Sequence, residues 1–139
     1  MNSQEKYEYW LDIANYDLET ASAMLAGSRW LYVVFMCQQA IEKLVKGLYI
    51  LYIDDDVPRI HNIKAIFKRF EDKLPSNIKL PFDKLEEKYK FFDRLSKYYL
   101  NNRYPEYMSK LSSQISEAEA KEILSQTQEE FKWLLTLHP

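Results

Sequence analysis

The sequence predicts an all-α protein, an up-and-down antiparallel bundle of four long helices and one short helix in a single domain of residues 1–139. Its 139 residues are 47% hydrophobic, which is enough for one buried core. Apolar residues recur at steps of three and four along several long segments. Glycine occurs twice and proline five times, too rarely for a sheet protein with many tight turns. Glycine-rich phosphate loops are also excluded, because Gly27 and Gly47 cannot form one.

Two long helices are predicted in the first half of the chain. The first covers about residues 3–26, because Asn2 and Glu5 form a capping-box pattern at its start and Gly27 supplies its end. The second covers about residues 29–53, and its wide apolar face indicates a central helix that is buried from more than one side. Its remaining face is polar and holds Gln38, Gln39, Glu42, Lys43 and Lys46.

Three further helices are predicted in the second half. A short helix begins near His61, and a longer one covers about residues 83–100. The last helix has the clearest start signal in the chain, a capping-box pattern formed by Ser116 and Glu119, and it runs to about Leu137. The short connections between these helices favour an antiparallel bundle.

Charge and hydropathy narrow the classes of function. Nineteen basic and twenty-one acidic side chains give a net charge of −2, which argues against a strong and indiscriminate attraction to nucleic acid. The sequence contains neither a run of 18 apolar residues nor a signal-peptide pattern, so we expect a cytoplasmic protein that does not contact a membrane. The lone Cys37 lies in an apolar stretch, where we expect a buried small hydrophobic residue in a reducing compartment.

The sequence offers no motif for a metal or an organic cofactor. Neither His61 nor His138 belongs to the Glu-x-x-His motif with which helical bundles bind di-iron. The acidic triplet at 54–56 lacks the spacing of a calcium loop. We expect the triplet to be a solvated helix end, with a Mg²⁺ site as the alternative, and we predict no metal and no cofactor.

Two polar residues are candidates for either a structural or a functional role. Asp17 falls within the apolar stripe of the first helix, where a buried carboxylate needs a partner such as Arg103 or a lysine of the second helix. Such a pair either sets the helix register or orients a ligand. His61 lies where the third helix begins, and it either makes local hydrogen bonds there or serves a site through a change of protonation near neutral pH.

Arg103 begins the longest segment without helical periodicity in the C-terminal half, residues 103–115, and Tyr104 and Pro105 follow it. An arginine can bind phosphate through two parallel hydrogen bonds, and a tyrosine can stack on a base. A corner that folds the loop back onto the core would use the same residues. Both interpretations stay open.

The ordered set of these residues resembles a known family. Two patterns on the first two helices carry the resemblance, Trp10-x-x-x-Ala14-x-x-Asp17-Leu18-x-x-Ala21 and Phe35-x-x-Gln38-Gln39-Ala40-x-Glu42-Lys43-x-x-Lys46. His61 then opens the next helix, and Arg103-Tyr104-Pro105 precedes the last one. Over roughly residues 5–137 the chain resembles the HEPN family, the higher eukaryotes and prokaryotes nucleotide-binding domain.

The resemblance implies a bundle of four or five helices that usually forms a homodimer and is concerned with nucleotides or RNA. Many small prokaryotic members are partners of a minimal nucleotidyltransferase, in several cases as toxin and antitoxin. Matched to the family's polar pattern, the candidate ligand-binding residues are Arg103 for phosphate, Tyr104 for stacking, Lys43 and Lys46 as supporting charges, and Asp17, Glu42 and His61 as orienting groups.

Ribonuclease members of the family carry an arginine followed by four to six residues and then a histidine. No arginine of this chain meets that spacing, and the three positions that would complete it after Arg103 hold Met108, Ser109 and Lys110. General acid–base cleavage of RNA needs a group that transfers a proton near the scissile phosphate. The missing histidine therefore favours a role without catalysis.

The leading interpretation is a non-catalytic HEPN module that binds a nucleotide or RNA and is the partner of a minimal nucleotidyltransferase. One alternative is a ribonuclease toxin with a non-standard active site, in which His61 replaces the missing histidine. The other is a structural subunit whose aromatic side chains form a dimer or heteromer interface. The candidates for that interface are Tyr7, Tyr9, Trp30, Tyr32 and Trp133.

Overall fold

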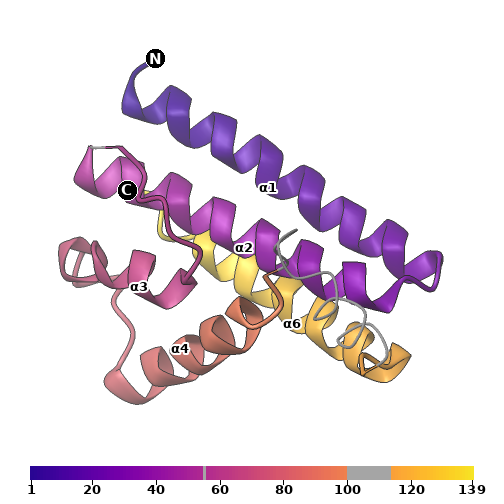
Figure 1. Ribbon diagram of the computed structural model, residues 1–139. Coiled ribbons are helices and arrows are strands. Elements are labelled where there is room, and N and C mark those ends of the chain that lie inside the picture. Colours follow the sequence, from indigo (N-terminus) through magenta and orange to yellow (C-terminus); the bar gives the residue numbers. More distant parts are fainter. Residues whose placement is uncertain (55, 100–113) are drawn as a thin grey trace.

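The computed structural model describes residues 1–54, 56–99 and 114–139 (Figure 1). These ranges form α-helices and one 3-10 turn without any strand, which confirms the predicted all-α fold. The elements are α1 (Ser3–Ala26), α2 (Trp30–Ile53), α3 (Ile63–Lys68), the 3-10 turn η1 (Glu71–Lys73), α4 (Phe82–Ser96) and α6 (Glu117–Leu135). None of these helices combines the length and the apolar composition that crossing a membrane requires.

Helix α2 is the centre of the bundle. It runs antiparallel to α1, which lies along one side of it, while α3, α4 and α6 pack against its other sides (Figure 1). Most side chains from Leu31 to Ile50 are buried, polar ones included. The width of the apolar face therefore predicted the central position correctly, but the polar face that remained is also largely inside the protein.

Short polar side chains set the ends of the helices. Asn2 and Glu5 form both halves of a capping box at the start of α1, as predicted. Ser116 accepts a hydrogen bond from the backbone of Glu119 and so caps α6. At the end of α2, Asp54 adopts a left-handed conformation, and its carboxylate accepts a hydrogen bond from the Ser3 hydroxyl. The first acid of the triplet is thus a helix cap that ties α2 to the N-terminus.

Helix α4 ends at Ser96, four residues before the predicted boundary. Tyr98 and Tyr99 continue the apolar spacing of three and four residues, but they lie beyond the end of the helix. The Tyr98 hydroxyl donates to Glu119 at 2.7 Å, and the Tyr99 ring stacks on His61. Contacts with other elements therefore outweigh the local preference for a longer helix.

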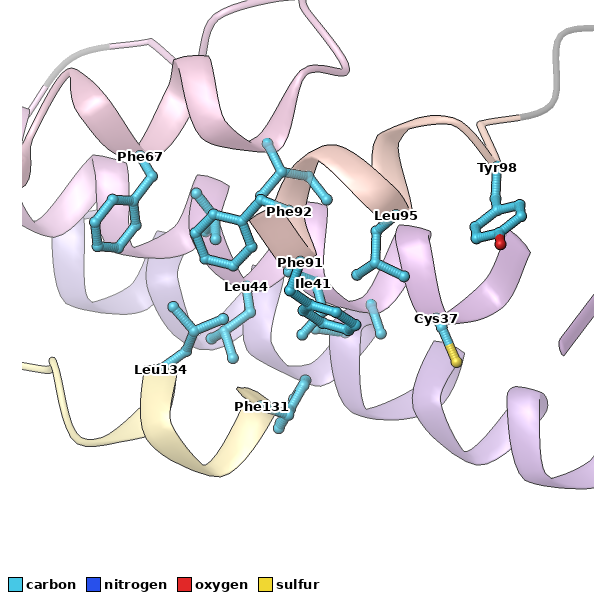
Figure 2. Close-up of a cluster of buried hydrophobic side chains, with 14 of the residues drawn as sticks. Cys37, Ile41, Leu44, Phe67, Phe91, Phe92, Leu95, Tyr98, Phe131 and Leu134 are labelled. Atoms are coloured by element: carbon cyan, nitrogen blue, oxygen red, sulfur yellow. The ribbon is translucent and has the colours of Figure 1, made fainter. Parts of the chain in front are cut away.

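The core is rich in aromatic rings from α3, α4 and α6 (Figure 2). Phe67 of α3 is fully buried, and its ring centre lies 5.0 Å from that of Phe70, 5.6 Å from that of Phe92 and 5.9 Å from that of Trp133. Aliphatic side chains of α2 and α6 close the cluster around these rings. A six-residue helix is too short to be stable alone, so this packing is what holds α3 in place.

Gly47 allows α1 to approach α2 closely. A Cβ atom at this position would lie 3.1 Å from Tyr7 Cδ2 and 3.2 Å from Trp10 Cβ. The Gly47→Val variant should push the helices apart and lower the free energy of unfolding in urea by about 1–3 kcal/mol. Gly27→Val is the control, because a Cβ there meets no neighbour closer than 3.5 Å. Equal losses in the two variants would contradict this account of the contact.

Cys37 is fully buried on α2, and burial raises the pKa of its thiol to about 12. Because the thiolate is the reactive form, we expect the native protein at pH 8 to resist iodoacetamide and to be labelled when urea unfolds it. Cys37 is the single cysteine of the chain, so mass spectrometry of the intact protein reports its reaction directly. Labelling of the native protein as fast as of the unfolded protein would show that this part of the core is open.

Candidate functional site

A buried carboxylate on α2 lies at the centre of the candidate site. Glu42 is 3% exposed and accepts hydrogen bonds from Gln38 Nε2 at 2.8 Å and from Lys46 Nζ at 3.1 Å. His61 Nδ1 lies 3.2 Å from each of its two oxygens. We call Gln38, Glu42, Lys46 and His61 the Glu42 cluster. The structure thus brings together three of the predicted site residues, and Gln38 joins them.

Helical spacing accounts for the α2 part of the Glu42 cluster. Residues four apart lie on one face of a helix, so Gln38, Glu42 and Lys46 form a row along α2. Gln39 Nε2 extends the row by donating to Gln38 Oε1 at 2.7 Å. Burying a charged group is costly unless a partner compensates it, and here each charge has one. The sequence signal for this row was the repeated spacing of four residues, from Gln38 to Glu42 and from Glu42 to Lys46.

His61 approaches the row from the connection between α2 and α3. Its side chain is 46% exposed, and its ring stacks on Tyr99 with the ring centres 3.9 Å apart and an angle of 14° between the planes. The helix that follows is capped by Asn62, which accepts from the Ala65 backbone at 3.0 Å. The contact of His61 with Glu42 is therefore not a local hydrogen bond, because the two residues are 19 positions apart in the sequence.

The position of Glu42 defines the chemistry of the imidazole ring. A carboxylate only accepts hydrogen bonds, so Nδ1 carries the hydrogen that points to Glu42. Nε2 lies at the opposite edge of the ring. It accepts a proton when the ring is neutral and donates one when the ring is charged. This arrangement suits either proton transfer or the binding of an anion.

Asp17 and Lys43 form a separate ion pair between α1 and α2. Lys43 Nζ lies 2.5 Å from Asp17 Oδ2, and the Asp17 side chain is nearly buried. The predicted partnership of Asp17 with a lysine of the second helix is therefore confirmed. Residues 42 and 43 are about 100° apart around the helix. Lys43 therefore faces Asp17 of α1, while Glu42 faces His61. The remaining predicted site residues, Arg103 and Tyr104, lie outside the described residues.

An open pocket of about 380 Å³ lies beside Trp10, and none of the four residues of the Glu42 cluster lines it. The Lys46 ammonium lies 6.0 Å from the centre of the Trp10 ring, and Trp10 lines the pocket, so Lys46 connects the two features. We call this cavity the Trp10 pocket; its lining residues are Lys6, Trp10, Ile50, Asp56, Val57 and Arg59.

No sequence pattern predicted this pocket. Trp10 is part of the family pattern, and Arg59 lacks the downstream histidine of the ribonuclease motif. Two spacings were available as signals, since Lys6 and Trp10 are four apart on α1 and Arg59 is two residues before His61. Neither spacing shows that α1 and the loop after α2 meet at the same place.

A second pocket of about 340 Å³ lies near Leu85 of α4 and Trp133 of α6. It shares no residue with the Glu42 cluster or the Trp10 pocket. Apolar side chains line much of it, and its charged residues are of both signs, Lys68, Glu71, Asp72 and Lys79. Its chemistry favours no particular ligand, and we do not assign it to the site.

The aromatic residues predicted for an interface lie in different surroundings. Tyr7 was a wrong choice, because it is 3% exposed and packs inside the chain against the ring of His138, 4.9 Å away. Tyr9 and Tyr32 are exposed at 57% and 43%, whereas Trp30 and Trp133 are half-buried. Two tyrosines thus remain well exposed for contact with another chain.

Comparison with known proteins places the chain among related folds. The HEPN domain family matches residues 7–137. The structure of TT1696 from Thermus thermophilus is similar with a TM-score of 0.72 and 25% sequence identity, over 98% of both chains. ST0689, an archaeal HEPN homologue, has the same fold with a TM-score of 0.66 and 24% identity, over 96% of this chain and 98% of that one.

A search of curated proteins gave no match. The family match nevertheless covers almost the whole chain and agrees with the helical architecture. The chain belongs to the HEPN domain family.

Proposed function

We propose that this HEPN domain is a nucleotide-binding module without catalytic activity, which holds phosphate with side chains rather than with backbone amides. The observation that carries the proposal is the convergence of Lys46 and His61 on the buried Glu42. The chain's shortage of glycine supports it, because no loop can wrap around a phosphate in the manner of a glycine-rich motif.

His61 is the member of the Glu42 cluster that reaches a ligand. A charged imidazole donates Nδ1–H to Glu42 and offers Nε2–H to a phosphate oxygen, a hydrogen bond between charged groups. Lys46 balances the charge of Glu42 and holds the carboxylate in position. Arg103 and Tyr104 stay predicted as phosphate and stacking ligands, Lys43 as a supporting charge and Asp17 as an orienting group.

Calorimetric titration with purine and pyrimidine nucleotides tests this function. We expect the wild-type protein to bind a nucleotide and His61→Ala to weaken binding roughly 10- to 100-fold, the contribution of one hydrogen bond between charged groups. His138→Ala is the matched control, because it removes the other histidine from outside the Glu42 cluster. Absence of binding for every nucleotide, or equal binding by His61→Ala, would contradict the proposal.

We also propose that the protein acts as a cytoplasmic homodimer and as the partner of a minimal nucleotidyltransferase. Family membership and the exposed Tyr9 and Tyr32 support an interaction surface. Light scattering at high micromolar concentration should give twice the chain mass of 16.7 kDa. The monomer mass at that concentration would count against the homodimer.

A ribonuclease with a non-standard active site is a second candidate function. The observation that favours it is the pair of Glu42 and His61, in which a carboxylate orients an imidazole as in general-base catalysis. Cleavage of a structured RNA without metal, lost in His61→Ala and reduced in Glu42→Gln, would establish this activity. An inactive wild-type protein would remove the candidate.

A further inference from the structure

We infer that the Trp10 pocket binds a nucleoside monophosphate, with the base against Trp10 and the phosphate on Lys6 and Arg59. His61 follows Arg59 by two residues in the same loop and contributes its Nε2–H to the same phosphate. This inference rests on the proposed function, and it names the place and the class of the ligand. Neither Lys6 nor Arg59 belongs to the family pattern described above.

The pocket has the size and the position of a ligand site. Its volume of about 380 Å³ falls within the roughly 300–1,000 Å³ that small-molecule sites occupy. Three separate parts of the chain form its walls, the first turns of α1, the end of α2 and the loop that follows. Lys46 lies 3.1 Å from Glu42 and 6.0 Å from the centre of the Trp10 ring, which lines the pocket.

Close packing at Gly47 places Trp10 where its ring can line the pocket and contact a ligand. Because α1 approaches α2 closely there, the Cβ of Trp10 lies directly over the glycine. The ring remains half-buried rather than enclosed in the core. Ile50, one turn farther along α2, and Val57 add apolar surface. An aromatic ring beside aliphatic side chains is suited to stack on a base.

The charged residues of the pocket indicate how many phosphates it accepts. Lys6 and Arg59 come from different elements, and an arginine can bind two phosphate oxygens at once. Asp56 lines the same pocket, so the lining residues carry one net positive charge. That charge suits one phosphate group better than the several negative charges of a triphosphate.

The two halves of the ligand are therefore recognised by different chemistry. The apolar and aromatic wall selects a flat ring, and the two cations select an anion attached to it. Free phosphate and free nucleoside each satisfy one half only. We expect AMP to bind at least about tenfold more tightly than adenosine or inorganic phosphate, and more tightly than ATP.

Trp10 provides a direct optical test. AMP should quench the tryptophan fluorescence of the wild-type protein and of Trp30→Phe, because Trp30 lies outside the pocket. In Trp10→Phe the quenching should disappear, while calorimetry shows that AMP still binds, because phenylalanine can also stack. Trp10→Ala should lose roughly 5- to 150-fold in affinity, the contribution of one stacked base.

Arg59→Gln tests the phosphate end at an exposed position where folding is not at risk. It should weaken AMP binding at least about tenfold, while Arg69→Gln, an exposed arginine outside the pocket, leaves it unchanged. If AMP binds but neither Trp10→Phe nor Arg59→Gln changes the signal, the pocket assignment is wrong and the proposed function stands. If ATP binds more tightly than AMP, the charge argument is wrong. If no nucleotide binds the wild-type protein, both proposals fail.

Discussion

Glu42→Ala is expected to lower the free energy of unfolding by about 3–5 kcal/mol, since removing one partner of a buried ion pair leaves the other charge uncompensated. Here the uncompensated group is Lys46, whose side chain is 9% exposed. Gln38 Nε2, in a fully buried residue, loses its acceptor as well. Urea denaturation followed by circular dichroism measures the change.

A pair with the same spacing on the surface provides the matched control. Glu117 and Lys121 of α6 are also four residues apart and 3.1 Å from each other, but both side chains are largely exposed. Glu117→Ala should cost no more than about 1 kcal/mol. The double variant Glu42→Met with Lys46→Met should be more stable than Glu42→Ala, because it buries no unpaired charge. Equal losses in Glu42→Ala and Glu117→Ala would show that the Glu42 cluster is not buried.

Phe67→Ala is expected to lower the free energy of unfolding by about 3–5 kcal/mol, the usual cost of removing a fully buried aromatic side chain. Phe67 belongs to α3 and contacts rings from α4 and α6, so the cavity would lie where three helices meet (Figure 2). Both the lost transfer free energy and the remaining cavity contribute to this value. Thermal and urea denaturation measure it.

Phe82→Ala is the control for this core prediction, because Phe82 is 79% exposed at the start of α4. A surface substitution of this kind should change stability by less than about 0.5 kcal/mol. If Phe67→Ala were as mild as Phe82→Ala, the aromatic cluster would not be what holds α3 against the bundle. AMP binding by a still folded Phe67→Ala should be unchanged, since Phe67 does not line the Trp10 pocket.

Local patterns predicted most of the helical architecture. The capping box at Asn2 and Glu5 and the N-cap at Ser116 are short-range features, and each marks a helix start in the structure. The predicted end of α4 was wrong because Tyr98 and Tyr99 make contacts with Glu119 and His61, which are distant in the sequence. Periodicity contains no information about such partners.

The candidate site was predictable only in part, for the same reason. Glu42 and Lys46 share a helix, so their spacing alone placed them together. His61 was a candidate by residue type, but its contact with Glu42 depends on the path of the loop after α2. Arg59 and Trp10 became candidates only when the structure brought that loop next to α1.

The buried polar residues of α2 matter both for the stability of the fold and for the candidate site. The pairing of Glu42 with Lys46 is necessary for stability because both side chains are buried. Glu42 also contacts His61, and Lys46 lies 6.0 Å from the centre of the Trp10 ring. A substitution of Glu42 is therefore expected to reduce both stability and ligand binding, and the two effects cannot be separated. Substitutions of the exposed His61 and Arg59 allow binding to be tested in a folded protein.

Together, the two proposals make the Glu42 cluster and the Trp10 pocket one nucleotide site. Titration of the ¹⁵N-labelled protein with AMP, followed by two-dimensional NMR, tests it most directly. We predict that signals shift for the Trp10 indole N–H and for the backbone amides of Gly47, Arg59 and His61, while the Trp133 indole is unchanged. Shifts centred on Trp133, or no shifts at millimolar AMP, would show that AMP does not bind at this site.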